Sequence, residues 1–208
     1  MSGWLDQRLY RHPFTGASAQ RYTRLERPGF GDLDERLVAR WAPDLAGARV
    51  VLDVGAGPGT LAAHLRAARP ELLVIEVEPS ADFAPTPGRL RAYGEALPLA
   101  GASVDLAVCL SSIRHVGDRA ATLRELRRVV RPGGVAHLVE LDPAASRARV
   151  AAHARRVRSR LLAAAFGPLV VYTAPHAREI AGLARAAGWS VVEQLDDPVQ
   201  PVYDLRLA

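Results

Sequence analysis

The stretch VVLDVGAGPG at residues 50–59 decides the fold of this chain. An apolar run leads directly into a turn that contains Gly55, Gly57 and Gly59, and the residues after it are typical of a helix. Glycine adopts positive φ freely and has no side chain, so the backbone of such a turn approaches a ligand closely. The following helix directs the positive end of its dipole at the same place. The pattern predicts a strand–turn–helix unit that binds a nucleotide.

A carboxylate follows these glycines at the expected distance. The next predicted strand ends in IEVEPS at residues 75–80, which places Glu78 at its end. Nucleotide-binding βαβ units carry an acid there, about 20 residues after the glycines, and it binds the ribose hydroxyls. Glu76 alternates to the other face of the same strand, so we expect it to be structural.

The glycine spacing separates two kinds of nucleotide fold. A dinucleotide-binding turn has the spacing G-x-G-x-x-G. This chain instead has G-x-G-x-G, with the acid Asp53 two residues before the first glycine. That pattern resembles motif I of the class I S-adenosylmethionine-dependent methyltransferases, in which Glu78 would be the second acidic motif.

Four later segments resemble the same family in the same order. They are the segment after the third strand (Tyr93–Leu99), the fourth strand (Ser103–Val108), the run after it (Ser111–Val116), and the helix end and turn before the fifth strand (Leu126–Gly134). Several motifs in order are more specific than any one of them. The resemblance covers about residues 35–195. It implies an α/β fold, a single-domain Rossmann-like doubly wound sheet that is mostly parallel with a terminal antiparallel strand.

The expected organisation is an N-terminal cap segment over residues 1–30 and a cofactor-binding domain over residues 31–208. The cap segment lacks clear periodicity but holds four aromatic residues, Trp4, Tyr10, Phe14 and Tyr22. We interpret it as a partly helical cover over the ligand face of the sheet. A chain of 208 residues is long enough to bury one sizeable core.

Hydrophobic patterning predicts the remaining elements. Continuous apolar runs, typical of a buried parallel sheet, predict strands at 49–54, 72–77, 89–93, 104–110 and 134–141. Predicted helices cover 32–41, 58–69, 119–130, 142–166 and 173–187. Asp118 is expected to cap the third of these helices and Pro132 to end it. The fourth is opened by Asp142, is rich in arginine and has an apolar stripe that includes Leu161. Thr173 is expected to cap the fifth. A terminal hairpin is expected over 189–195 and 199–207.

One segment departs from the family pattern. Between the second and third strands the chain has only residues 81–88, where the family has a helix, and Pro85 and Pro87 make a long helix improbable there. We expect either a partner subunit, in a homodimer, or the N-terminal segment to cover this edge of the sheet.

The resemblance implies S-adenosylmethionine as cofactor and S-adenosylhomocysteine as its product. The implied contacts are with the amino acid end (Asp53), the turn backbone (Gly55, Ala56, Gly57, Gly59), the ribose (Glu78, Pro79), the adenine (Tyr93, Gly94, Glu95, Ala96), the methionine portion (Ser111, Ser112) and the cap (Tyr22). Tyr93 stands where the family commonly has an Asp that binds the adenine amine. Either Glu95 replaces that contact or Tyr93 stacks on the ring. Leu97 and Phe83 are candidate walls of the adenine slot.

Arg114 and His115 lie where related enzymes place residues that face the acceptor, so they are the candidate catalytic residues. Methyl transfer is an in-line displacement, and alignment of the reacting atoms is the enzyme's main task. A general base is needed only if the acceptor must lose a proton. The imidazole group titrates near neutrality in general, so His115 suits that role. The alternative is a structural histidine that packs the loop or caps the helix that begins after Asp118.

Composition limits the remaining possibilities. The net charge of +5 comes from arginines that are spread along the chain, which gives little support for a nucleic-acid partner. No apolar run approaches the ~20 residues of a membrane span, and one cysteine suits a reducing cytoplasm. The six histidines lack metal-ligand spacing. We therefore favour methyl transfer to a small-molecule acceptor. The alternatives are an RNA or protein methyltransferase and a non-catalytic cofactor-binding module.

Overall fold

A central sheet organises the computed structural model, which describes residues 11–24, 30–157 and 159–208. In these residues the sheet has seven strands in the order β3-β2-β1-β4-β5-β7-β6. They are β1 (Val50–Val54), β2 (Leu73–Val77), β3 (Arg89–Leu90), β4 (Val104–Leu110), β5 (Val130–Leu141), β6 (Val191–Asp196) and β7 (Val202–Leu207). The first five are parallel, and β7 runs antiparallel to both β5 and β6. The predicted fold class is confirmed.

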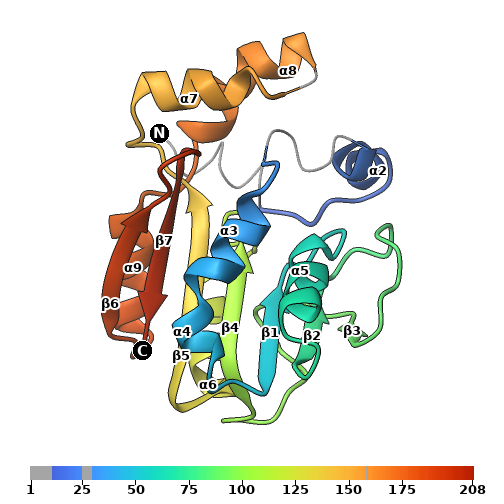
Figure 1. Ribbon diagram of the computed structural model, residues 1–208, viewed down its shortest axis with the longest axis vertical. Coiled ribbons are helices and arrows are strands. Elements are labelled where there is room, and N and C mark those ends of the chain that lie inside the picture. The colour runs from blue at the N-terminus through green and yellow to red at the C-terminus, as the bar shows by residue number, and fades with distance from the viewer. Residues whose placement is uncertain (1–10, 25–29, 158) are drawn as a thin grey trace.

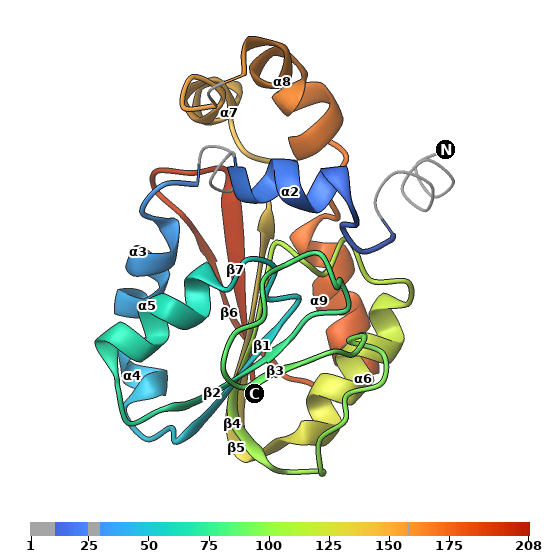
Figure 2. The same cartoon turned by 90° about the vertical axis from the view of Figure 1, so that its right-hand side faces the viewer.

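Helices cover both faces of this sheet and its upper edge. They are α2 (Ala17–Arg24), α3 (Leu33–Arg40), α4 (Ala42–Leu45), α5 (Thr60–Ala68), α6 (Arg119–Val129), α7 (Arg147–Ala154), α8 (Arg160–Ala165), the π-helical segment η1 (Phe166–Val171) and α9 (Ala177–Ala186). Figure 2 shows α3, α4 and α5 on one face, α6 and α9 on the other, and α2, α7 and α8 beyond the carboxyl ends of the parallel strands. Figure 1 shows the same arrangement face-on.

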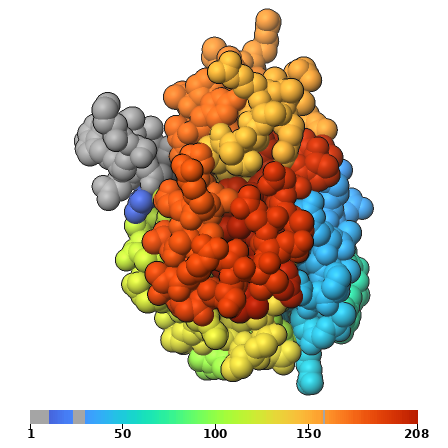
Figure 3. Space-filling view, turned by 90° about the vertical axis from the view of Figure 1, so that its left-hand side faces the viewer, coloured from blue at the N-terminus to red at the C-terminus, as the bar shows by residue number. Residues whose placement is uncertain are grey.

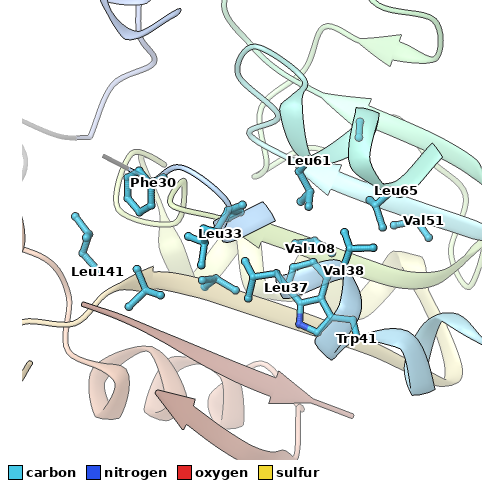
Figure 4. Packing of buried hydrophobic residues seen from close by; sticks show 14 of the residues in the cluster. Phe30, Leu33, Leu37, Val38, Trp41, Val51, Leu61, Leu65, Val108 and Leu141 are labelled. Atoms are coloured by element: carbon cyan, nitrogen blue, oxygen red, sulfur yellow. The ribbon is translucent and has the colours of Figure 1, made fainter. Parts of the chain in front are cut away.

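Each face of the sheet has its own apolar core. On the α3 side, Leu33, Leu37 and Trp41 are almost fully buried against the strands (Figure 4). On the other side, α6 and α9 bury Leu126 and Ile180. Removing one such side chain from water stabilises the fold by about 1.5–3 kcal/mol. Both cores position the strands so that their carboxyl ends meet at one edge.

The region between β4 and β5 differs in part from the prediction. Asp118 caps α6 as expected, because its Oδ1 accepts the N–H of Ala121 at 2.9 Å. α6 ends at Val129, within one residue of the predicted end, but β5 begins at the next residue and not at Gly134 as predicted. Pro132, Gly133 and Gly134 therefore lie within β5. A Cβ on Gly134 would lie 2.6 Å from the carbonyl oxygen of Asp105, so only glycine allows this approach to β4.

The segment after β5 is not the single helix that the arginine-rich pattern predicted. It contains α7, α8 and η1, separated by a break before α8 (Figure 3 shows this segment in orange above α9 and the terminal hairpin). Ser146, not Asp142, caps α7, with its Oγ accepting the N–H of Arg149 at 3.3 Å. Asp142 instead accepts the N–H of Ala144 at 2.9 Å in a local turn.

Two further expectations for this region, about Leu161 and Thr173, are also wrong. The break rotates the second helix, so Leu161 is 87% exposed instead of continuing the apolar stripe of α7. Thr173 does not cap α9, which begins after His176. Its hydroxyl instead donates to the carbonyl oxygen of Leu169 at 2.8 Å and accepts from Arg114 at 3.0 Å.

The predicted absence of a helix between β2 and β3 is confirmed, and arginines hold this edge in its place. Arg66 donates to the carbonyl oxygens of Val74 and Pro87, at 3.0 and 2.9 Å. Arg89 donates to the carbonyl oxygen of Ala84 at 2.9 Å. Both guanidinium groups also pair with the buried carboxylate of Glu76, at 2.9 and 2.6 Å. Glu76 is therefore structural, as expected.

The N-terminal segment also reaches this edge. The N–H of Gly16 donates to Asp82 at 2.7 Å, and the rings of Tyr22 and Phe83 meet edge to face at 6.5 Å. This contact supports the second of the two expected covers. The alternative cover, a partner subunit in a homodimer, stays a prediction.

We expect Glu76→Gln to destabilise the protein mainly above pH 4.5. Burial raises the pKa of Glu76, but hydrogen bonds from Arg89, Thr86 and Arg66 outweigh it and lower the pKa below 4.5. A lowered pKa in the folded state stabilises the fold above the unfolded value, and this stabilisation is lost as the pH falls through the folded value. The variant leaves two arginines unpaired, so the free energy of unfolding at pH 7 falls by about 3 kcal/mol.

Urea unfolding between pH 7 and pH 3 measures this effect. The difference between the variant and the wild type should narrow as the pH falls below 4.5. Glu71→Gln is the matched control, because Glu71 is exposed and pairs only with Arg69 at the surface. A constant difference across the pH range would contradict the assignment.

Candidate active site

A cavity of about 470 Å³ opens at the carboxyl ends of β1, β2 and β4. Every residue predicted to contact the cofactor lines this cavity except Gly59. The lining residues from that prediction are Asp53, Gly55, Ala56, Gly57, Glu78, Pro79, Tyr93, Gly94, Glu95, Ala96, Ser111, Ser112 and Tyr22. Residues distant in the sequence therefore meet at one place, as the carboxyl ends of parallel strands require.

The glycine turn has the left-handed backbone that its sequence indicated. The φ angles of Gly55, Gly57 and Gly59 are 75°, 52° and 82°. A Cβ on Gly57 would meet only the ring of Phe83, at 3.9 Å, so the cavity is open above it. A Cβ on Gly59 would instead lie 3.0 Å from Glu76 Oε2. Gly59 thus faces the ionic cluster behind the turn and starts α5.

The two acids beside the turn are buried. Glu78 is 5% exposed, and its oxygens accept the N–H groups of Gly57 at 2.8 Å and Ser80 at 2.9 Å. These hydrogen bonds fix the carboxylate at the cavity wall. Asp53, 2% exposed, lies at the end of β1 in the same wall. Both side chains lie where the sequence analysis expected them.

The segment after β3 forms another wall. Tyr93 is 57% exposed at its rim. Glu95 accepts the N–H of Asp118 at 3.0 Å through Oε1, and its buried Oε2 has no hydrogen-bond partner in the part of the chain that the structure describes. Phe83 lines the cavity as expected. Leu97 does not, since it belongs to the core beneath α6.

Two serines after β4 form the floor. Ser112 is engaged within the fold, because its hydroxyl donates to the carbonyl oxygen of Val54 at 2.6 Å and contacts Cys109 Sγ at 2.9 Å. Burial raises the pKa of Cys109 to about 12, so it stays a structural thiol. Ser111 has a φ of 51°, which is uncommon for a residue other than glycine. Its buried Oγ has no hydrogen-bond partner among the described residues.

Aromatic rings of the cap lie over the cavity. Phe14 stacks on Tyr22 at 5.0 Å, and it also lies 5.0 Å from the ring of His115. Residues 11–24 therefore cover the ligand face, as the sequence predicted. Trp4 and Tyr10, the other two aromatic residues of the expected cap, lie outside the described residues.

A second cavity of about 430 Å³ adjoins the first. The two share His12, Phe14, Tyr22, Ser111 and His115 in their walls. The second is otherwise lined mainly by apolar residues from α2, α8 and η1, and by two buried charged residues. The apolar lining residues are Ala17, Phe30, Leu141, Leu162, Phe166 and Val170.

Arg114 and Glu140 are the buried charged residues of this second cavity. Arg114 is 2% exposed and donates to the carbonyl oxygen of Val170 at 2.8 Å and to Thr173 Oγ1 at 3.0 Å. It thus joins the end of β4 to η1. Arg21 of α2 also lines this cavity.

Sequence reasoning missed the second cavity and Glu140. The available signal was a single acid near the carboxyl end of the apolar strand Val135–Leu141, at the edge where ligands bind. The residues of the cap and of η1 carried no such signal, because their positions depend on how those segments fold over the sheet.

Neither a metal-binding cluster nor a membrane-spanning helix is found among the described residues. No cluster of three or more His, Cys, Asp or Glu residues with metal-binding geometry occurs among them. None of their helices is both long and apolar enough to cross a membrane.

Sequence comparisons find relatives that share this part of the chain. A family model described as a methyltransferase domain matches residues 52–138. The ubiquinone/menaquinone biosynthesis C-methyltransferase UbiE of Syntrophotalea carbinolica is 37% identical over 135 residues, which are 59% of this chain and 57% of that protein. An uncharacterized methyltransferase of Mycobacterium sp. (strain KMS) is 44% identical over 99 residues, 44% of this chain and 38% of that protein. The chain thus spans only about half the length of these relatives.

Solved structures share the fold over most of the chain. A putative S-adenosylmethionine-dependent methyltransferase from Methanococcus maripaludis has a TM-score of 0.71 at 15% identity, covering 94% of this chain and 93% of that one. One from Aquifex aeolicus has a TM-score of 0.68 at 14% identity, covering 92% and 98%. Residues 52–138 therefore match a methyltransferase domain, and the chain has the fold of S-adenosylmethionine-dependent methyltransferases.

Proposed function

We propose that this chain transfers a methyl group from S-adenosylmethionine to a small-molecule acceptor. The observation that carries the proposal is the pair of adjoining cavities, which share the wall formed by Phe14, Ser111 and His115. The first has the acids and glycines of a nucleotide site, and the second is mainly apolar. A donor in the first cavity would therefore face an acceptor in the second.

The residues of the first cavity fit the cofactor. Glu78 is fixed by two backbone N–H groups and presents its remaining lone pairs for the ribose hydroxyls. The unpartnered Oε2 of Glu95 suits the adenine amine, which favours Glu95 over Tyr93 for that contact. Asp53 would hold the amino group. Gly57 leaves open space above the turn.

The bound cofactor would supply an electrophilic methyl group on a sulfonium. The chain's own task is to align the acceptor with that group and to exclude water. The aromatic cap serves the second purpose. His115 lies in the wall that both cavities share and is the candidate base for acceptors that must lose a proton. Arg114, whose guanidinium donates to the carbonyl oxygen of Val170 in η1, fixes part of the wall of the acceptor cavity.

A small acceptor is favoured over RNA or protein on two grounds. The second cavity is lined by residues of the cap, α8 and η1, and its volume suits a small molecule. The relative from Syntrophotalea carbinolica is named as a C-methyltransferase of quinone biosynthesis, which is small-molecule methylation. The proposed reaction belongs in the cytoplasm, where the cofactor is made and the single thiol stays reduced.

Methyl-labelled S-adenosylmethionine tests the proposal. The purified protein and the labelled cofactor are incubated in separate reactions with three kinds of acceptor. These are a library of small aromatic alcohols, amines and carbonyl compounds, total RNA, and protein extract. Label in the small-molecule fraction supports the proposal. Label only in RNA or protein supports the rival enzyme, and cofactor binding without any transfer supports a non-catalytic module.

A further inference from the structure

We infer that Glu140 is a specificity-determining residue of the second cavity, which selects an uncharged, largely apolar acceptor that presents a carbonyl or hydroxyl oxygen to its carboxyl group. This inference rests on the proposed function, because it assigns the chemistry of the acceptor site. It concerns a residue outside the stretch 52–138 that matches the methyltransferase domain.

The position of Glu140 makes its carboxyl group unusual. It lies one residue before the end of β5 and is fully buried in the wall of the second cavity. Oε1 accepts the N–H of Leu141 at 2.8 Å. Oε2 has no hydrogen-bond partner among residues 11–24, 30–157 and 159–208. Buried polar atoms are nearly always paired in folded proteins, so an unpaired one beside a cavity indicates a ligand.

The nearest polar residue across the sheet does not satisfy this oxygen. Tyr203 pairs with Glu140 in the register of β5 and β7. Its hydroxyl is already used, because it donates to the carbonyl oxygen of Pro175 at 3.1 Å. Tyr203 therefore does not compete with a ligand for Oε2, which is buried in the cavity wall.

Burial also shifts the titration of Glu140. It raises the pKa of this carboxyl group above its ordinary value, although the charge of Arg114 and hydrogen bonds from the backbone N–H groups of Leu141 and Arg114 oppose the effect. The protonated form of a carboxyl group donates a hydrogen bond. In that form Glu140 binds an oxygen that accepts one, such as a carbonyl.

The rest of the cavity determines the body of the acceptor. Ser111, Arg114, His115 and Glu140 lie at or just after the carboxyl ends of β4 and β5, so these polar groups gather at one end. α8 and η1 contribute apolar residues to the other walls, and α2 contributes Ala17 together with the polar residues Ser18 and Arg21. An occupant with one polar end and an aromatic or aliphatic body satisfies both parts. A charged carboxylate would lose its hydration in such a site.

Binding of three matched probes to the protein saturated with S-adenosylhomocysteine tests this inference. The probes are 2-acetylnaphthalene, naphthalene and 2-naphthoate, measured by titration calorimetry. We expect 2-acetylnaphthalene to bind most tightly. Glu140→Leu should weaken its binding about fivefold to tenfold, as expected for one lost hydrogen bond. Glu140→Gln should stay within about threefold, because the amide keeps a donor. The affinity for naphthalene should not fall in either variant.

Two controls separate a binding role from a structural one. Glu140→Gln should keep the urea unfolding midpoint, because its amide oxygen can still accept the N–H of Leu141. Glu140→Leu leaves that N–H unpaired, so only this variant should lose some stability. Both should bind S-adenosylhomocysteine within twofold of the wild type. The inference is wrong if Glu140→Leu leaves the affinity for 2-acetylnaphthalene unchanged, or if 2-naphthoate binds more tightly than the ketone. Failure of the wild type to bind S-adenosylhomocysteine would instead overturn the proposed function.

Discussion

Glu78→Ala should weaken the binding of S-adenosylmethionine by about 100-fold. The carboxylate is positioned by the N–H groups of Gly57 and Ser80 and would accept both ribose hydroxyls. Hydrogen bonds to a charged group contribute about 1.5–3 kcal/mol each, and a loss of ~3 kcal/mol corresponds to two orders of magnitude in affinity. Titration calorimetry with the purified protein measures the change directly.

Asp82→Ala is the matched control for this experiment. Asp82 lies four residues later on the same linker, is exposed, and accepts only the N–H of Gly16. Its removal should change the affinity less than threefold. Glu78→Gln should lie between the two, because the amide keeps one acceptor but not the charge. Equal affinities of Glu78→Ala and the wild type would mean that the ribose does not lie at the end of β2.

Gly55→Ala should lower the free energy of unfolding by about 4 kcal/mol. The φ of Gly55 is 75°, where a side chain adds about 1–2 kcal/mol of strain. The new Cβ would also lie 2.4 Å from Ser112 Cβ and 2.7 Å from its Oγ. Ser112 cannot retreat freely, because its hydroxyl donates to Val54. Overpacking of this kind typically adds 1–3 kcal/mol. Urea unfolding measures the loss.

A double variant keeps this prediction testable if Gly55→Ala fails to fold. Adding Ser112→Gly removes the contacted atoms, so the two changes together should destabilise less than their sum, by about 1–2 kcal/mol. Gly182→Ala is the opposite control, since Gly182 is exposed in α9 and a Cβ there meets nothing within 4 Å. It should stabilise the fold by about 0.5–1 kcal/mol. Additivity at positions 55 and 112 would show that the contact is not the cause.

The parts of the fold that follow from local rules were predictable. Strands such as β4 were evident because a buried parallel strand is apolar on both faces. The cap at Asp118 and the missing helix beside Pro85 follow from backbone chemistry, which acts over a few residues. For the same reason the residues proposed to bind the cofactor could be located, since the turn at Gly55 and the acid Glu78 each follow a recognisable strand.

The parts that depend on tertiary packing were not predictable. Residues 142–166 have the composition of one helix, but the chain breaks before Ser159 so that η1 can return to the sheet and meet Arg114. Nothing local indicates that return. Glu140 was missed because its significance lies in an oxygen that finds no partner, which only the assembled cavity shows.

The division between the two cavities also has an evolutionary meaning. The residues that would hold the donor lie mainly between Asp53 and Ser112, inside the stretch that matches the methyltransferase domain at 52–138. Residues of α2, α8 and η1 line the second cavity, and these three segments all lie outside that stretch. Substitutions in these segments can therefore change which acceptor is recognised without changing the residues that would hold the cofactor. The two outer segments can be exchanged together between homologues to redirect such an enzyme.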